Sequence, residues 1–241
     1  MGRIAAEDLI SDIHRKDRIL KTRVIILLSL GTILTSVSGL ASDGPGIRQS
    51  VAQAAGQALA DWLVKIPNGQ EAGYGFSGRA DFRRATAGTP IRMATISPKS
   101  VSADAGPDSA KVELLDVFRV PVLVDGRYLA LLTVDCAGGH CKVVEIGAAR
   151  LARELDDFMR QGIVTGPGEQ AFLLRIFQLH SDLLLVSANP GKPGAGQIYP
   201  LQSARMFLRL GTRATIDWRR LIEILDSQFK AMAEHPRGVR P

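Results

Sequence analysis

Residues 117–146 constrain the fold more than any other stretch, because two tight turns separate three apolar runs. Asp125-Gly126 is typical of a two-residue hairpin turn, in which both central residues need a positive φ. A second turn falls between Cys136 and Cys141. We therefore predict three consecutive antiparallel strands joined by short connections.

Closing the first turn pairs Val124 with Arg127 and, by simple counting, Val120 with Leu131. Since side chains alternate along each strand, this register predicts one apolar face. Its members would be Phe118, Val120, Val122, Leu129, Leu131, Val144 and Ile146. Pro121 cannot donate a backbone hydrogen bond, so we expect its strand to lie at an edge there.

The rest of the chain alternates between helical and strand patterns. Apolar residues recur at helical spacing in residues 47–66, 148–161 and 215–234. Strand patterns occupy residues 91–97, 171–179, 183–188 and 198–210, the last with a break near Pro200. Strands joined by tight turns cannot be parallel, so the pattern predicts an α+β fold. We expect an antiparallel sheet built from hairpins and packed by an N-terminal, a middle and a C-terminal helix.

The N-terminal region has the pattern of a secretory signal peptide. Residues 24–40 carry no charge, follow a basic stretch, and end in small residues at Gly39 and Ala41. We predict a signal peptide over residues 1–41; the alternative is an uncleaved membrane anchor, because seventeen uncharged residues are close to the shortest spanning length. Residues 42–241 would then form one exported α+β domain, or two loosely similar halves that meet near 162–169.

Composition gives little support for a nucleic-acid partner. Residues 1–41 hold six of the 30 basic and four of the 24 acidic residues, so the remainder carries a net charge of +4. The basic residues form no run of five, and aromatic residues make up only 5% of the chain. We expect no nucleic acid, and contact with a membrane only if residues 24–40 are retained.

Cys136 and Cys141 are the only cysteines, and they flank the second turn. On paired strands they would face each other within disulfide range, and export favours oxidation. We predict a structural disulfide; a redox-active pair, free thiols or a metal site are the alternatives. Redox pairs more often have two intervening residues at the start of a helix, which this turn lacks.

We expect neither a metal nor a cofactor. The four histidines, at positions 14, 140, 180 and 235, lack the spacing of a ligand set. Residues 73–78 match Gly-x-Gly-x-x-Gly by letter, but a helical pattern precedes them where a dinucleotide site needs a strand.

We also expect no catalytic residues. Ser77 is one residue out of place for a nucleophile elbow. His180-Ser181-Asp182 contains the residue types of a triad, but contiguous residues cannot make its geometry, and a polar hairpin tip is the simpler interpretation. Glu154, Asp156 and Asp157 are expected to form a solvated helix face.

Three hypotheses follow from these patterns. The leading one is an exported, non-enzymatic α+β protein that binds another macromolecule or a cell-envelope component. The alternative is an exported hydrolase whose site is built from residues distant in sequence, with His140 or His180 beside a carboxylate in a deep pocket. The third is an accessory protein of the envelope, anchored by residues 24–40.

Overall fold

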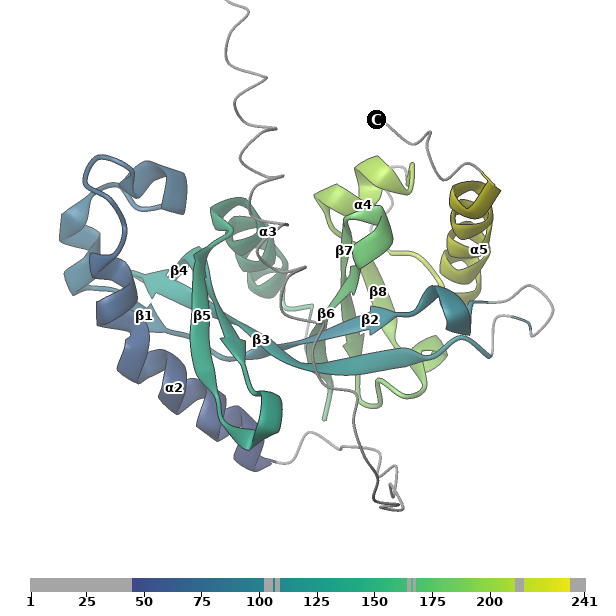
Figure 1. The fold of residues 1–241 in the computed structure, drawn as a ribbon, viewed down its shortest axis with the longest axis horizontal. Coiled ribbons are helices and arrows are strands. Elements are labelled where there is room, and N and C mark those ends of the chain that lie inside the picture. Colours follow the sequence, from purple (N-terminus) through teal and green to yellow (C-terminus); the bar gives the residue numbers. More distant parts are fainter. Residues whose placement is uncertain are drawn as a thin grey trace, which may run out of the picture. The chain divides into compact units, whose positions relative to one another are not determined.

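One eight-stranded sheet runs through the computed structural model, which describes residues 45–101, 106, 109–163, 166, 168–210 and 215–234. The strands are β1 (Thr86–Ala87), β2 (Ile91–Ile96), β3 (Val112–Val124), β4 (Arg127–Asp135), β5 (Lys142–Gly147), β6 (Gln170–Ile176), β7 (Ser181–Ser187) and β8 (Gln197–Pro200). The helices are α2 (Pro45–Val64), α3 (Ala149–Arg160), α4 (Gln202–Phe207) and α5 (Trp218–Glu234), as Figure 1 shows. Short 3₁₀ turns include η1 (Glu71–Tyr74), η2 (Arg79–Arg83), η6 (Ala137–Gly139) and η7 (Phe177–Leu179).

The strand order confirms the α+β class and adds one unexpected pairing. The order is β5-β4-β3-β2-β6-β7-β8, with β1 paired to β3. All neighbours are antiparallel except β2 and β6, which run parallel. The sheet therefore consists of two antiparallel parts, which are joined where β2 pairs with β6.

Helices cover both faces of the sheet. β2 contributes Ala94 to the hydrophobic cluster beneath α5 and Met93 to the cluster beneath α3, so these helices lie on opposite faces. The side chains of β4 also alternate between the two faces: Leu132 packs in the cluster beneath α2 and Leu131 in the cluster beneath α3. The N-terminal, middle and C-terminal helices predicted from the sequence are thus all packed on the sheet.

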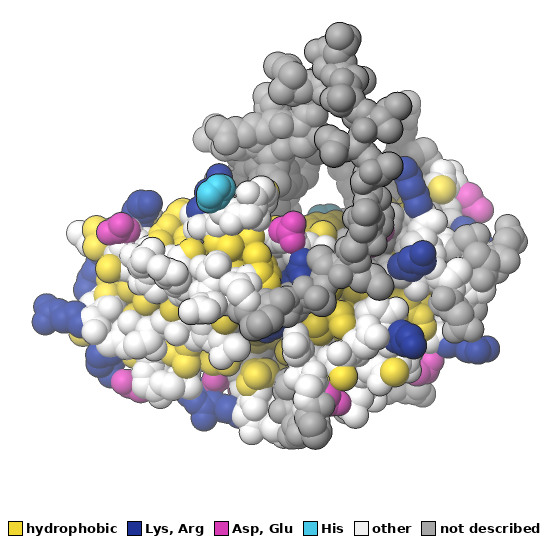
Figure 2. Space-filling view, turned by 90° about the horizontal axis from the view of Figure 1, so that it is seen from below, with side chains coloured by type: hydrophobic (Ala, Val, Ile, Leu, Met, Phe, Trp, Pro, Cys, Tyr) yellow, Lys and Arg dark blue, Asp and Glu magenta, His cyan; other side chains and the backbone are white. Residues whose placement is uncertain are grey.

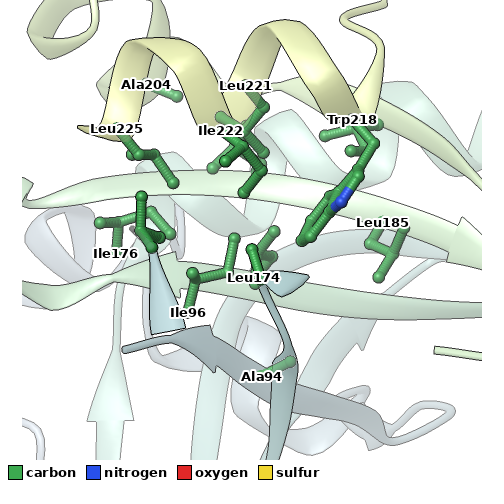
Figure 3. Close-up of a cluster of buried hydrophobic side chains, with 14 of the residues drawn as sticks. Ala94, Ile96, Leu174, Ile176, Leu185, Ala204, Trp218, Leu221, Ile222 and Leu225 are labelled. Atoms are coloured by element: carbon green, nitrogen blue, oxygen red, sulfur yellow. The ribbon is translucent and has the colours of Figure 1, made fainter. Parts of the chain in front are cut away.

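The contact of α5 with the sheet shows how these helices are held. Trp218, Leu221, Ile222 and Leu225 point from one side of α5 onto Leu174, Ile176 and Leu185 of the sheet, with Ala94 and Ile96 nearby (Figure 3). Removing a large aliphatic side chain of this kind from water contributes about 1.5–3 kcal/mol. The helix is stabilised mainly by this buried stripe.

The predicted register of the first hairpin is correct at its turn and wrong beyond it. Val124 pairs with Arg127, but a bulge between Val122 and Leu123 places Val120 opposite Leu132 instead of Leu131. A one-residue slip moves every later side chain to the other face. Leu131 is fully buried as expected, but it packs beneath α3, on the face opposite to Val120 and Val122.

Pro121 lies in an interior strand, at a place where the neighbouring chain is not a strand. β1 ends at Ala87 and β2 begins at Ile91, so irregular residues lie alongside Pro121. The N–H of Gly88 donates to the Pro121 carbonyl at 2.8 Å. The missing donor of proline is therefore accommodated by a break in the neighbouring strand, while β3 remains inside the sheet.

The strand predicted over residues 198–210 ends early. β8 stops at Pro200, and α4 follows at once. The buried residues Leu201, Ala204 and Leu208 recur at helical spacing, and the N–H of Leu208 donates to the carbonyl of Ala204 at 2.9 Å. The sequence contained this helical period, but the preceding strand pattern masked it.

Candidate functional site

Cys136 and Cys141 lie at the tip of the β4–β5 hairpin, where η6 makes the turn. Their sulfur atoms are at disulfide bonding distance, 2.05 Å. Cys136 is buried in the cluster beneath α2, and Cys141 is half-buried beside it. This apolar, cross-linked pair has the surroundings of a structural staple.

The carboxylates of α3 differ from the solvated face that the sequence suggested. Asp156 is only 2% exposed. Its Oδ2 accepts hydrogen bonds from Arg127 Nε at 2.5 Å and from Arg160 Nε at 3.0 Å, and its Oδ1 accepts one from the N–H of Tyr128 at 3.3 Å. Burial alone would raise the pKa of Asp156, but these donors together hold it below the ordinary aspartate value. Asp156 therefore ties α3 to the β3–β4 hairpin.

Glu154, on the same helix, connects α3 to α4. Its Oε1 accepts hydrogen bonds from the N–H of Gln202 at 2.6 Å and from Arg205 at 3.0 Å. Burial raises the pKa of this carboxyl above its usual value. Of the three acids, only Asp157 is largely exposed, at 67% of its side chain. Two of them thus act as structural ties.

His180, Ser181 and Asp182 do not form a polar tip. His180 is exposed in a left-handed conformation, whereas Ser181 and Asp182 begin β7 and are buried. Ser203 Oγ donates directly to Asp182 Oδ2 at 3.3 Å and accepts from the N–H of Asp182 at 2.9 Å. A serine nucleophile needs an imidazole between itself and the carboxylate, so this contact has the wrong order for a triad.

A row of charged side chains crosses part of the sheet. The guanidinium of Arg119 binds the hydroxyl of Thr133 and lies 3.4 Å from Glu145 Oε2. Burial lowers the pKa of Arg119, while the charge of Glu145 opposes that change. Arg119 Nε is buried without a hydrogen-bond partner in the described structure. The hydroxyl of Thr133 donates in turn to Glu145 Oε2 at 2.9 Å, so the row links β3, β4 and β5.

Exposed apolar side chains gather at one corner of the molecule. We call this the aromatic corner and define it by Phe177, His180, Met206 and Phe207. Phe177, Met206 and Phe207 are 47%, 62% and 41% exposed, and they are three of the five large hydrophobic residues exposed in the described chain. The ring of His180 lies 6.4 Å from that of Phe207. Exposed apolar groups that cluster in this way are typical of an interaction surface.

Two neighbouring elements build the aromatic corner. η7 carries Phe177 at the turn between β6 and β7, and α4 carries Met206 and Phe207. Figure 1 shows α4 beside the upper end of β7. The N–H of Leu201 donates to the Asp182 carbonyl at 3.1 Å, which joins the start of α4 to β7. The apolar side chains therefore project from a hydrogen-bonded scaffold.

Three arginines lie on or next to the elements that build the aromatic corner. The guanidinium of Arg175 lies 5.7 Å from the centre of the Phe177 ring and 3.6 Å from Asp182. Arg205 pairs with Glu154, and Arg209 is exposed just beyond Phe207. On the face drawn in Figure 2, in contrast, Lys and Arg side chains are scattered among Asp and Glu.

A groove of about 540 Å³ is lined in part by residues 208–210, which directly follow Phe207 in the sequence. It lies between residues 208–210 and α5, and its lining is mixed in polarity. Among its charged residues, Arg220 pairs with Glu223 at 3.1 Å, and Asp217 Oδ1 accepts the N–H of Arg220 at 2.8 Å. The lining residues include neither histidine nor cysteine, so this groove is not the histidine-containing pocket that the hydrolase hypothesis expects.

The remaining sequence candidates, the glycine-rich residues 73–78 and the histidines, do not form a cofactor or metal site among the described residues. Residues 73–78 connect η1 to η2 and follow no strand, and Gly75 lies so close to β4 that an added Cβ would be 2.2 Å from the Leu129 carbonyl oxygen. His14 and His235 lie outside the described residues. Within the described residues no group of three or more His, Cys, Asp or Glu side chains could hold a metal ion.

Together these features define an α+β protein with a disulfide-linked hairpin and one exposed aromatic corner. No protein-family model, no curated protein and no solved structure matches the chain. No helix among the described residues is long and apolar enough to cross a membrane. Residues 24–40 lie outside that part of the chain.

Sequence reasoning missed the aromatic corner for a physical reason. Phe177 ends an apolar run whose other members are buried, and Phe207 stands in a segment that was interpreted as a strand. The pattern gives no signal for which apolar residues a turn leaves exposed. The helical period of residues 201–208 could have placed Met206 and Phe207 on the outer side of α4.

Proposed function

We propose that this is an exported, non-enzymatic protein that binds another macromolecule or a cell-envelope component through its aromatic corner. The observation that carries the proposal is the concentration of three exposed large hydrophobic side chains on η7 and α4. Leaving them in water costs free energy that a partner could recover by covering them.

The rigidity of the aromatic corner supports this proposal. Phe177 and Phe207 project from elements fixed by main-chain hydrogen bonds and by the contact between Ser203 and Asp182. A preformed surface loses less conformational entropy when it binds than a mobile loop does. Aromatic side chains are also the residues that most often dominate binding energy.

The competing hydrolase hypothesis has less support. Ser203 contacts Asp182 without an intervening imidazole, and the ring of His180 lies beside that of Phe207, 6.4 Å away and tilted. Among the charged groups of the groove, Arg220 is paired with Glu223, and Asp217 accepts the backbone N–H of Arg220. The arrangement therefore offers a binding surface more readily than an acid–base pair.

Site-specific photocrosslinking in the exporting cell tests the proposal. A photoreactive amino acid replaces Phe207 in one variant and Val64, which is 74% exposed at the end of α2, in the matched control. We expect an adduct of discrete composition from position 207 that position 64 does not give. If neither position 207 nor position 64 gives an adduct, or if both give the same adducts, the aromatic corner has no specific role in binding.

A further inference from the structure

Asn68 and Gly69 form an exposed turn between α2 and η1. The N–H of Gln70 donates to the Pro67 carbonyl at 3.1 Å, and Gly69 has a φ of 82°. A turn of this kind takes glycine at its third residue because a side chain there would be strained. We propose that Asn68 is a site of spontaneous deamidation, at which the asparagine becomes aspartate or isoaspartate.

The reaction needs only these two residues and water. The backbone nitrogen of Gly69 attacks Cγ of Asn68, and the new C–N bond closes a cyclic imide. The proton of that nitrogen passes to a base and then to the leaving side-chain amide, which departs as ammonia. Water opens the imide at either carbonyl carbon, so the product carries a new carboxylate on a normal or a β-linked main chain.

The turn leaves the attacking nitrogen accessible. Gly69 has no side chain, and a Cβ added to it would meet no atom within 4 Å. Glycine also allows the peptide plane between Asn68 and Gly69 to rotate toward Cγ at little cost. The Asn68 side chain is exposed, so the water that opens the imide reaches it directly.

Glu71 supplies a carboxylate beside that nitrogen. Its Oε1 accepts a hydrogen bond from Arg79 Nε at 2.8 Å. Its own backbone N–H, the side chain of Arg79 and the backbone N–H of Gly69 hold the pKa of Glu71 below its usual value, against the effect of burial. An ionised carboxylate is therefore hydrogen-bonded to the N–H that the reaction deprotonates. We expect Glu71 to accept this proton as a general base.

Two related sequences in the chain lack this arrangement. The only other asparagine, Asn189, precedes Pro190, whose nitrogen carries no hydrogen and cannot form the imide. Asp125 precedes a glycine but pairs with Arg84, and an ionised carboxylate is a poor target for a nucleophile. The structure thus singles out one of these three positions.

Peptide mapping by mass spectrometry of the purified exported protein, incubated at neutral pH, tests the inference. We expect conversion at Asn68 to be at least about tenfold faster than at Asn189, because Pro190 offers no N–H. Asn68→Gln should remove the acidic species that accumulates on isoelectric focusing, since the longer side chain closes its ring far more slowly. Comparable rates at the two asparagines, or an Asn68 that stays intact in the native protein while the protein unfolded in urea converts, would overturn the proposal.

Glu71→Gln tests the general base, since the glutamine oxygen can still accept the hydrogen bond from Arg79. We expect it to slow the native reaction about threefold or more. The matched control is Glu223→Gln on α5, which should leave the rate unchanged. In urea the wild type and Glu71→Gln should convert equally, because unfolding removes the contact with Gly69. Equal rates in the native proteins, or a difference that persists in urea, would overturn the role of Glu71.

The turn at Asn68 belongs to none of the elements of the aromatic corner. The deamidation experiment and the photocrosslink at position 207 therefore succeed or fail independently.

Discussion

At the residue scale, Asp156 is the most informative side chain. An acidic residue on an amphipathic helix is usually solvated, and Asp157, the next residue along α3, is indeed exposed. Asp156 is instead buried against two arginines, each about half-exposed. The difference depends on Arg127 and Tyr128, which the hairpin brings beneath α3. No local pattern around position 156 contains that information.

We predict that Asp156→Asn destabilises the protein by about 1–3 kcal/mol at pH 7, since the ionised carboxylate satisfies three donors. The pKa of Asp156 is lowered by folding, so its contribution is present above the ordinary aspartate value and is lost as pH falls below it. Urea unfolding at pH 7 and near pH 3 measures both effects.

The matched control is Asp157→Asn, because Asp157 is exposed on the next position of α3. We expect this variant to lose less than about 0.5 kcal/mol. A difference between wild type and Asp156→Asn that stays constant down to pH 3 would show that the carboxylate charge is not the source of stability.

At the element scale, the β4–β5 hairpin carries the disulfide and a second register irregularity, between Thr133 and Val134. The pair closes a loop with a sequence separation of only 5, so cross-linking restricts the unfolded chain little. The buried position of Cys136 adds a packing contribution. The staple is expected to fix the hairpin register more than the whole fold.

We predict that Cys136→Ser/Cys141→Ser folds with a loss of about 2 kcal/mol or less and keeps its partner. Chemical unfolding and the photocrosslink at position 207 measure these two properties. Thiol titration of the native exported protein should find no free sulfhydryl before reduction. A folded double variant that loses all its cellular activity would support a redox pair instead.

Most helices and strands were predictable because apolar residues recur in them at a regular spacing and turn residues bound them. α2, α3, α5 and β2 begin and end within three residues of their expected ranges. The register was not predictable beyond the first turn, because the bulge at Val122 and Leu123 depends on contacts across the sheet. The parallel pairing of β2 and β6 likewise has no local signal.

At the scale of the whole molecule, the N-terminal segment remains a prediction, because residues 1–44 lie outside the described part. We expect cleavage near Ala41, since small residues at positions 39 and 41 end an uncharged segment. Mass spectrometry of the exported protein should give an N-terminus within a few residues of Ser42. Recovery of residues 24–40 in the mature product would favour the anchor.

The parallel pairing of β2 and β6 also affects the order in which the sheet can form during synthesis on the ribosome. β3, β4 and β5 follow one another through short connections and can pair soon after they are made. Arg92 and Phe172, which face each other across β2 and β6, are 80 positions apart. A nascent chain that has emerged only as far as α3 therefore exposes one side of β2 to any passing strand. Until β6 is synthesised, we expect that unpaired edge of β2 to be open to association with other chains.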